Sequence, residues 1–260
     1  MSSLLKDKVA IITGGGRGIG RSFALRFADE GAKLLLADID FGNAEKVAAE
    51  VRARGGEAFA VKTNIADKDS TKEMADKVME HFGRVDILVN NASIWFGLDI
   101  TPWDAWEVEE WDRIFDVNVK GTWLCCQAVA PLMIKQKKGK IINISSGVPK
   151  SPAAQLWLPY SLSKGAVYTL THALARALGP SGINVNSIAP GYTASEASLA
   201  QAQYKEIEEA TIAARCIPRS EKPLDLVGSA VFLASDDSDF LAGQTLFVAV
   251  SYTHLRAHET

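Results

Sequence analysis

Apolar residues along the chain fall into short runs that alternate with longer amphipathic segments. The early runs are apolar at consecutive positions, which is typical of strands buried on both faces of a parallel sheet. This order predicts an α/β fold: a single doubly wound, Rossmann-type domain whose seven-stranded parallel sheet is flanked by helices. The expected strands are 9–13, 34–38, 58–63, 86–90, 140–145, 183–189 and 244–248. The expected helices are 18–31, 43–54, 68–82, 107–137, 160–179 and 223–235.

The predicted domain extends over residues 1–250, since no linker rich in proline and glycine divides it. Residues 251–260 look foreign to this fold, because they contain neither glycine nor proline and hold two of the four histidines. We expect this segment to be a non-native tail, with a genuine but divergent tail as the alternative.

Composition narrows the class of protein. With 260 residues, 47% of them hydrophobic, the chain can bury one large core. The net charge of −3 gives no indication of a nucleic-acid or membrane partner, and the apolar runs are far shorter than the ~20 residues of a membrane span. Cys125, Cys126 and Cys216 lack metal-ligand spacing, so no metal is expected. The N-terminus has no signal-peptide pattern, which favours a reducing, cytoplasmic location.

Tyr160 and Lys164 stand four residues apart in a predicted helix, so they share one of its faces. A free phenol has a pKa of about 10 and is a poor base at neutral pH. A neighbouring ammonium favours the phenolate and lowers that pKa. The pair therefore predicts a device for proton transfer, with a packed tyrosine beside a surface lysine as the plainer alternative.

A glycine-rich turn at 13–20 joins the first strand to the first helix. Gly14, Gly18 and Gly20 allow a sharp turn and a close approach of the backbone to a pyrophosphate, toward which the helix points its first amides. The turn predicts a dinucleotide site, and a tight turn without a ligand is the alternative. Asp38, at the end of the second strand, can accept the ribose hydroxyls of NAD and repels the 2′-phosphate of NADP, whereas Arg17 could hold that phosphate. We expect NAD.

The chain resembles the short-chain dehydrogenase/reductase superfamily over nearly its whole length. Six motifs carry the resemblance: Thr13-Gly14-x-x-x-Gly18-x-Gly20, Asn90-Asn91-Ala92, Asp116-Val117-Asn118-Val119, Ile144-Ser145-Ser146, Tyr160-x-x-x-Lys164, and Asn184-x-Asn186 before Pro190-Gly191. The resemblance implies a catalytic tetrad of Asn118, Ser146, Tyr160 and Lys164.

In the implied roles, Tyr160 exchanges a proton with the substrate oxygen while hydride passes to or from the nicotinamide. Ser146 holds that oxygen and favours its developing charge. Lys164 lowers the Tyr160 pKa and holds the nicotinamide ribose. Asn118 fixes a water that links Lys164 to solvent, and the alternative for this residue is an asparagine that only bonds backbone. Ser145 is the weaker candidate for the catalytic serine.

The resemblance also implies the cofactor contacts, some of which depart from the family pattern. Ser93, Asn64 and Ser195 stand where the family usually has glycine, aspartate and threonine. From Ser146 to Tyr160 the gap is one residue longer than is common. The implied cofactor residues are Gly14, Gly16, Arg17, Gly18, Ile19, Gly20, Asp38, Asn64, Ile65, Asn91, Ala92, Ser93, Tyr160, Lys164, Pro190, Gly191, Thr193 and Ser195.

The substrate pocket is expected between the aromatic stretch 94–106 and a lid at 194–218. Aromatic side chains there favour a bulky or aromatic substrate, although some of the tryptophans could simply pack helices. The expected substrate residues are Ser146, Trp95, Trp157, Tyr160 and Tyr192.

Within the superfamily, the stretches 194–198 and 223–226 most resemble NAD-dependent dehydrogenases of aryl or other cyclic secondary alcohols. We therefore expect an NAD-dependent enzyme that interconverts a secondary alcohol and a ketone. An NADP-dependent 3-oxoacyl reductase and a non-catalytic dinucleotide-sensing module are the alternatives. The resemblance also implies a homotetramer or dimer assembled through helices 107–137 and 160–179.

Overall fold

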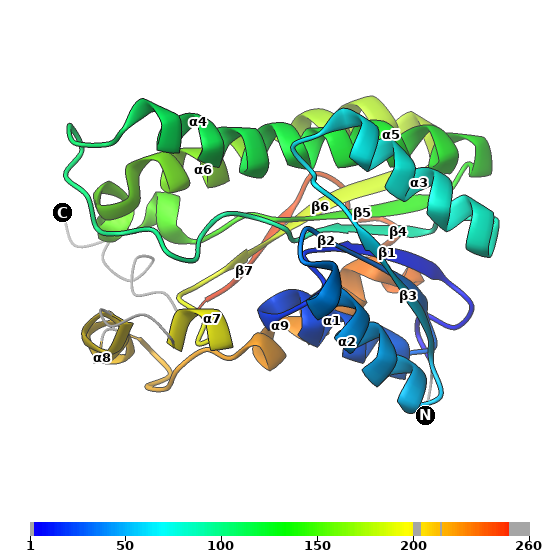
Figure 1. Ribbon diagram of the computed structural model, residues 1–260, viewed down its shortest axis with the longest axis horizontal. Coiled ribbons are helices and arrows are strands. Elements are labelled where there is room, and N and C mark those ends of the chain that lie inside the picture. The colour runs from blue at the N-terminus through cyan, green and yellow to red at the C-terminus, as the bar shows by residue number, and fades with distance from the viewer. Residues whose placement is uncertain (1–2, 200–203, 214, 250–260) are drawn as a thin grey trace.

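A parallel sheet in the order β3-β2-β1-β4-β5-β6-β7 runs through the middle of the molecule (Figure 1). The computed structural model describes residues 3–199, 204–213 and 215–249. The predicted tail at 251–260 lies outside them. The sheet confirms the predicted fold class. Its strands are β1 (Val9–Thr13), β2 (Lys33–Asp38), β3 (Glu57–Lys62), β4 (Ile87–Asn90), β5 (Gly139–Ile144), β6 (Ile183–Pro190) and β7 (Thr245–Val248).

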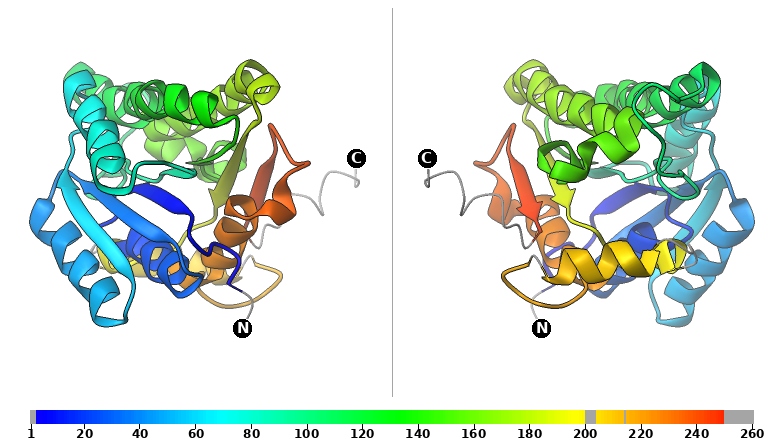
Figure 2. Two further views of the ribbon diagram at one scale, coloured as in Figure 1. Left: turned by 90° about the vertical axis from the view of Figure 1, so that its right-hand side faces the viewer. Right: turned by 90° about the vertical axis from the view of Figure 1, so that its left-hand side faces the viewer.

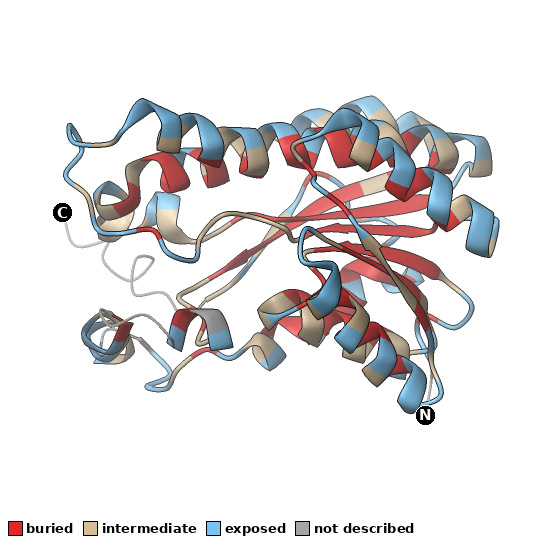
Figure 3. Ribbon diagram, in the orientation of Figure 1, coloured by how far each residue is buried: buried red, intermediate tan, exposed pale blue. Residues whose placement is uncertain are grey.

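Helices cover both faces of the sheet, and the side views of Figure 2 show the same layers. Buried side chains of α1 (Gly18–Asp29), α2 (Phe41–Ala53) and α9 (Pro223–Ala234) form one core cluster with the strands. On the other face, the second cluster comes from α3 (Lys68–Phe82) and α5 (Thr122–Gln136). Figure 3 shows the central strands β1, β2, β4, β5 and β6 buried between these layers, which explains their apolar sequences, whereas the edge strands β3 and β7 are more exposed.

Four further α-helices complete the described fold, together with short 3₁₀ turns. The longest of the four, α6 (Leu158–Leu178), follows β5 and packs on the same face as α3 and α5. Beyond the carboxyl end of β6 lie α7 (Glu196–Leu199) and α8 (Tyr204–Ala213), at the lower left of Figure 1. No helix among the described residues is both long and apolar enough to span a bilayer.

The predicted helix 107–137 has a wide turn in its middle. It consists of α4 (Val108–Phe115), a π-helical segment (Asp116–Gly121) and α5. Tight packing accompanies the π segment: a Cβ on Gly121 would lie 2.8 Å from the Ile65 side chain. Such π segments are frequent at functional sites, and this one carries Asn118.

The helices α2 and α3 have side-chain caps at their first turns, whereas α1 has none among the described residues. Asp40 caps α2 by accepting a hydrogen bond from Asn43 N (3.1 Å), and Asp67 caps α3 by accepting one from Ser70 N (2.9 Å). In the described structure α1 has no side-chain cap, because its N-cap position holds Arg17. Its first amides are therefore left to a ligand or to solvent.

Candidate active site

The strand order reverses between β1 and β4, and ligands of open α/β sheets bind at the carboxyl edge beside such a switch point. The loops after β1, β4, β5 and β6 meet there. They carry the glycine turn, the Asn90-Asn91-Ala92 motif, Ser146 and the Pro190-Gly191 motif.

Tyr160 and Lys164 lie together near the start of α6, and both are buried, with 8% and 3% of their surfaces exposed. The Lys164 Nζ donates a hydrogen bond to the carbonyl of Ile144 (2.8 Å). The same Nζ lies 5.7 Å from the centroid of the Tyr160 ring. The spacing on the helix thus produces the proximity that the sequence predicted.

Burial controls the ionisation of both groups. Burial raises the pKa of Tyr160. A hydrogen bond from the neighbouring Ser146 hydroxyl favours the phenolate and lowers that pKa in part. Burial lowers the pKa of Lys164 to about 7. An ammonium with a pKa near neutrality gains its proton readily when an anion approaches, and its charge then favours the phenolate.

The two serines after β5 have different surroundings. Ser145 is buried, and its hydroxyl donates to the carbonyl of Lys164 (3.0 Å), which fixes β5 against α6. Ser146 is only partly buried; its hydroxyl accepts from Val148 N (3.1 Å) and affects the Tyr160 phenol. Ser146 is therefore the serine that is available beside Tyr160. Two short 3₁₀ turns occupy the longer gap between Ser146 and α6.

Asn118 is buried in the π segment and bonds to two elements of the site. Its Oδ1 accepts from the amide of Ile94 (2.7 Å), and its Nδ2 donates to the carbonyl of Ile94 (3.1 Å) and to Ser163 Oγ (3.0 Å). Ser163 in turn donates to the carbonyl of Tyr160 (2.7 Å). These are mainly the backbone contacts of the alternative interpretation. They connect Asn118 to α6 through Ser163, a residue that the sequence analysis did not select.

The glycine turn is shaped by contacts that exclude side chains. Gly14 and Gly18 have φ angles of 65° and 55°, which favour glycine. A Cβ on Gly20 would collide with the carbonyl oxygen of Gly14. From the β4 side, Asn91 Nδ2 donates to the carbonyls of Thr13 and Gly14 (both 3.0 Å). The amide of Ala92 donates to Thr13 Oγ1 (3.1 Å), so the two loops are held together.

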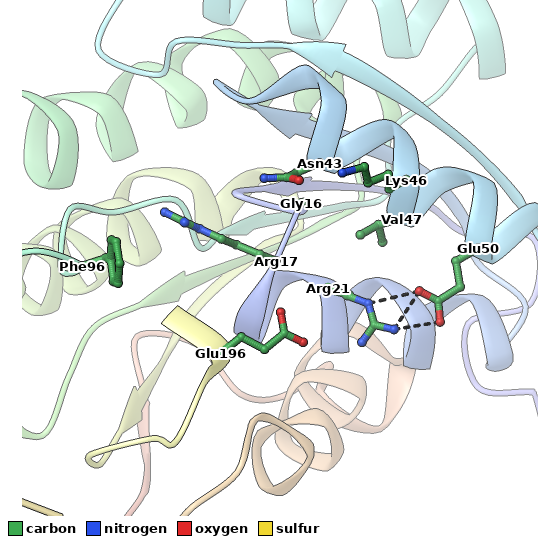
Figure 4. Close-up of a pocket in the computed structure, with 9 residues that line it drawn as sticks. All are labelled: Gly16, Arg17, Arg21, Asn43, Lys46, Val47, Glu50, Phe96 and Glu196. Carbon is green, nitrogen blue, oxygen red and sulfur yellow. Dashed lines mark hydrogen bonds and ion pairs between the residues drawn. The ribbon is translucent and has the colours of Figure 1, made fainter. Parts of the chain in front are cut away.

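Asp38 closes the other side of this turn. Its carboxylate accepts from the amides of Gly16 (2.9 Å) and Asp40 (3.0 Å). A pocket of about 420 Å³ opens beside it, with the Arg17 guanidinium placed over the Phe96 ring at 5.3 Å (Figure 4). The residues that line the pocket are Gly16, Arg17, Arg21, Asn43, Lys46, Val47, Glu50, Phe96 and Glu196. The uncapped start of α1, the glycine turn and this pocket fit an anionic dinucleotide.

Other predicted cofactor residues border this region with varied contacts. Ile19 packs against the core, and Ile65 is buried against the π segment. Asn64 is exposed, and its Oδ1 accepts from the amide of Ala66 (3.1 Å). Ser93 is partly buried after β4.

The residues after β6 link the glycine turn to the Tyr160 region. The carbonyl of Pro190 accepts from Gly147 N (2.8 Å), next to Ser146. Ser195 faces Gly18: a Cβ there would lie 3.6 Å from the Ser195 Cβ. The Ser195 hydroxyl caps α7 by accepting from Ser198 N (3.2 Å).

Aromatic side chains surround Tyr160 on the predicted substrate side. The Trp95 ring lies 4.6 Å from the Tyr160 ring and 5.1 Å from the Trp157 ring, measured between centroids. Tyr192 lies 6.4 Å from Trp95. Ile207 of α8 packs against the same cluster. By contrast Trp103 is 72% exposed, so the tryptophans of stretch 94–106 do not all face the site.

The comparisons with known proteins identify the family. A family model of the short chain dehydrogenases matches residues 8–206. The chain belongs to this family. Galactitol 2-dehydrogenase of Agrobacterium fabrum is 41% identical over 93% of this chain and 95% of that protein. A 3-oxoacyl-[acyl-carrier-protein] reductase of Staphylococcus epidermidis is 36% identical over 93% of this chain and 97% of its own length.

Solved structures of short-chain dehydrogenases agree with this assignment. A xylitol dehydrogenase with bound NAD⁺ has a TM-score of 0.87 at 30% identity, covering 95% of this chain and 99% of its own. A candidate NAD(P)-dependent gluconate 5-dehydrogenase of Beutenbergia cavernae, with NADP at low occupancy, has a TM-score of 0.88 at 32% identity, covering 96% and 98%. The protein is thus an oxidoreductase of a family that binds NAD or NADP. The alternative of a non-catalytic sensor is set aside.

Proposed function

We propose that this short-chain dehydrogenase interconverts a secondary alcohol and a ketone with NAD. The observation that carries the proposal is the buried pair of Tyr160 and Lys164 beside Ser146, at the sheet edge that also holds the glycine turn. When bound, the nicotinamide supplies the hydride acceptor or donor. Asn118, Ser146, Tyr160 and Lys164 form the proposed catalytic set.

Each proposed role follows from a contact in this site. In alcohol oxidation, the Tyr160 oxygen takes the hydroxyl proton, and in reduction it returns one. The Ser146 hydroxyl donates to the substrate oxygen and stabilises its partial negative charge. A protonated Lys164 offsets the cost of a buried phenolate, which burial alone disfavours. Asn118 acts through Ser163 and α6 by holding the Tyr160 backbone, and a water relay from Lys164 remains part of the proposal.

For the substrate, we propose a bulky or aromatic secondary alcohol, because Trp95 lies against Tyr160 and is itself in contact with Trp157 and Tyr192. The 41% identity with galactitol 2-dehydrogenase favours a polyol as the second candidate substrate. The similarity to 3-oxoacyl-[acyl-carrier-protein] reductases makes a 3-oxoacyl thioester the third candidate substrate. Initial rates on a panel of aryl and cyclic alcohols, polyols, sugar acids and 3-oxoacyl thioesters, each with NAD(H) and NADP(H), separate the three. Absence of turnover on every alcohol and ketone would contradict the proposed reaction.

Cofactor choice yields a direct prediction. We expect kcat/KM for NAD to exceed that for NADP by about tenfold or more, since a lost charged hydrogen bond costs about 1.5–3 kcal/mol and 1.4 kcal/mol is roughly tenfold. Asp38→Ser should reduce that preference, because it removes the carboxylate that would face a 2′-phosphate. Asp40→Ser is the matched control: serine can still cap α2, so the ratio should not change. Equal use of NADPH by the wild type would show that Arg17 outweighs Asp38.

Assembly as a homotetramer is also proposed, through the outer surface of α5 and α6. An apolar groove of about 380 Å³ lies there, lined by Phe115, Asp116, Val119, Lys120, Trp123 and Leu170. Trp123 is 42% exposed in the single chain. We expect Trp123→Glu to lower the mass measured by light scattering, whereas Trp103→Glu, at another exposed tryptophan, should not. A monomeric wild type at micromolar concentration would exclude the assembly.

We further propose that residues 1–250 make up the functional domain and that 251–260 are a non-native addition. A reducing, cytoplasmic location is proposed as well, in which the exposed thiol of Cys216 would stay reduced.

A further inference from the structure

The loop after β6 is fastened to the segment that joins α8 to α9. Thr193 and Glu221 form an isolated parallel bridge, and the amide of Ala194 donates to the carbonyl of Glu221 (2.7 Å). The Arg215 guanidinium donates to the carbonyl of Tyr192 (2.8 Å). Arg215 and Glu221, both from this one segment, therefore hold the loop in place.

The Glu221 side chain makes the innermost of these contacts. It is 5% exposed, and its Oε1 accepts from the Thr193 hydroxyl (2.8 Å). Its Oε2 lies against Gly191, where a Cβ would come within 2.7 Å of that oxygen. One carboxyl thus touches both Gly191 and Thr193.

The surroundings of this carboxyl make it unusual. Burial raises the pKa of Glu221, while the Thr193 hydroxyl and the Arg215 charge lower it. A carboxyl in such a place destabilises the fold unless its contacts compensate for the lost hydration. An apolar side chain would avoid this cost, so the hydrogen bond to Thr193 is the feature that the acid provides.

The loop itself occupies the space between the two halves of the proposed site. Ser195 lies opposite Gly18 of the glycine turn, and Tyr192 lies beside Trp95, whose ring contacts Tyr160. A dinucleotide that reaches from the glycine turn to Tyr160 must therefore pass along residues 191–195.

We propose that Glu221 is a positioning residue for the nicotinamide half of the dinucleotide. Through Thr193 and Gly191 it holds the loop backbone in the conformation that receives this half, and it does not touch the adenosine half. The inference rests on the proposed function, since it requires a dinucleotide in this site.

The connection extends to α8. Ser220, next to Glu221, donates to the Glu208 carboxylate (2.5 Å), and Tyr204 stacks on Tyr192 with ring centroids 4.8 Å apart. A change at Glu221 therefore reaches the helix that covers the aromatic cluster as well as the loop below it.

The test compares a whole dinucleotide with its adenosine half. Quenching of tryptophan fluorescence measures the Kd of NADH and NADPH, and calorimetry measures that of AMP. We expect Glu221→Ala to weaken the preferred dinucleotide about tenfold, or about 1.4 kcal/mol, with AMP binding unchanged. Glu221→Gln retains an oxygen acceptor for Thr193 and should stay within about threefold of the wild type.

Thr193→Val removes the other partner and should weaken the dinucleotide as much as Glu221→Ala. The double variant should be no weaker than either single one, since all three lack the same hydrogen bond. Asp225→Ala is the matched control: it removes a nearby acid in the first turn of α9 that pairs with Arg219 (2.6 Å), so it should lower Tm without changing either Kd.

The measurements distinguish failure of the positioning role of Glu221 from failure of dinucleotide binding itself. Equal weakening of AMP and dinucleotide, or no weakening in Glu221→Ala, would overturn the positioning role. If Glu221→Ala does not fold, unchanged dinucleotide binding by Thr193→Val overturns it instead. A wild type that binds neither NADH nor NADPH contradicts the proposed function itself.

Discussion

Replacing Tyr160 by phenylalanine is expected to lower turnover by about 10²–10⁴, the usual effect of removing a general acid or base. The change deletes only the phenol oxygen, so the ring can still pack against Trp95 and the helix can keep its bonds to Ser163. NADH binding should therefore stay within a few-fold of the wild type. Steady-state rates with the best alcohol of the panel, together with Kd values from fluorescence, check both parts.

A second tyrosine on the same helix gives a matched control. Tyr168 is at the surface, where its ring packs edge-on against His172. Tyr168→Phe should leave both turnover and cofactor binding unchanged. Near-full activity of Tyr160→Phe would sink the assigned chemistry, whereas loss of activity in both variants would indicate damage to α6.

Much of this fold could be predicted because its signals are local. Strands buried on both faces need consecutive apolar residues, and the sheet shows this in β1, all of whose residues are buried. The glycine turn could also be predicted, because Gly14 and Gly18 adopt φ angles that other residues avoid. The pairing of Tyr160 with Lys164 follows from helical spacing alone.

Features that depend on contacts between distant segments could not be predicted. The sequence predicted ordinary helix where the π segment lies, because the close contact of Gly121 with Ile65 joins residues more than fifty positions apart and leaves no local signal. The sequence analysis did not select Glu221, because its burial and its hydrogen bond to Thr193 depend on a contact across 28 residues of the chain. Ser163 had one available signal, a serine three residues after Tyr160 on the buried face of a helix.

The tryptophans between positions 95 and 111 show where residue type alone misleads. Trp95 contacts Tyr160, but Trp111 stacks on Phe115 within its own helix, with centroids 5.5 Å apart. Both residues are tryptophans, and their different contacts follow from where the backbone places each of them. The proposal of a bulky substrate therefore rests on Trp95, Trp157 and Tyr192 rather than on the number of tryptophans.

Lys164→Met is expected to change both catalysis and the pH dependence of stability. For catalysis, loss of the ammonium should shift alcohol oxidation to higher pH and weaken cofactor binding. For stability, burial lowers the folded-state pKa of Lys164 to about 7, below the ordinary value of 10.5. Between these two values the unfolded chain binds the extra proton, so the free energy of unfolding of the wild type should rise with pH by at most about 1.4 kcal/mol per unit from this group.

Below pH 7 the lysine is protonated in both states, so its contribution stops changing, and in Lys164→Met the rise should be absent. Urea denaturation of cofactor-free protein from pH 7 to 9.5 gives the difference between variant and wild type, in which the effects of other groups cancel. Lys77→Met provides the control: this lysine is exposed and its pKa is raised by Glu80, so its removal should leave the slope over this range unchanged. If the free energy of unfolding changed with pH equally in Lys164→Met and the wild type, Lys164 would keep its proton when buried. If the pH–rate profile of Lys164→Met were that of the wild type, Lys164 would have no part in tuning the pKa of Tyr160.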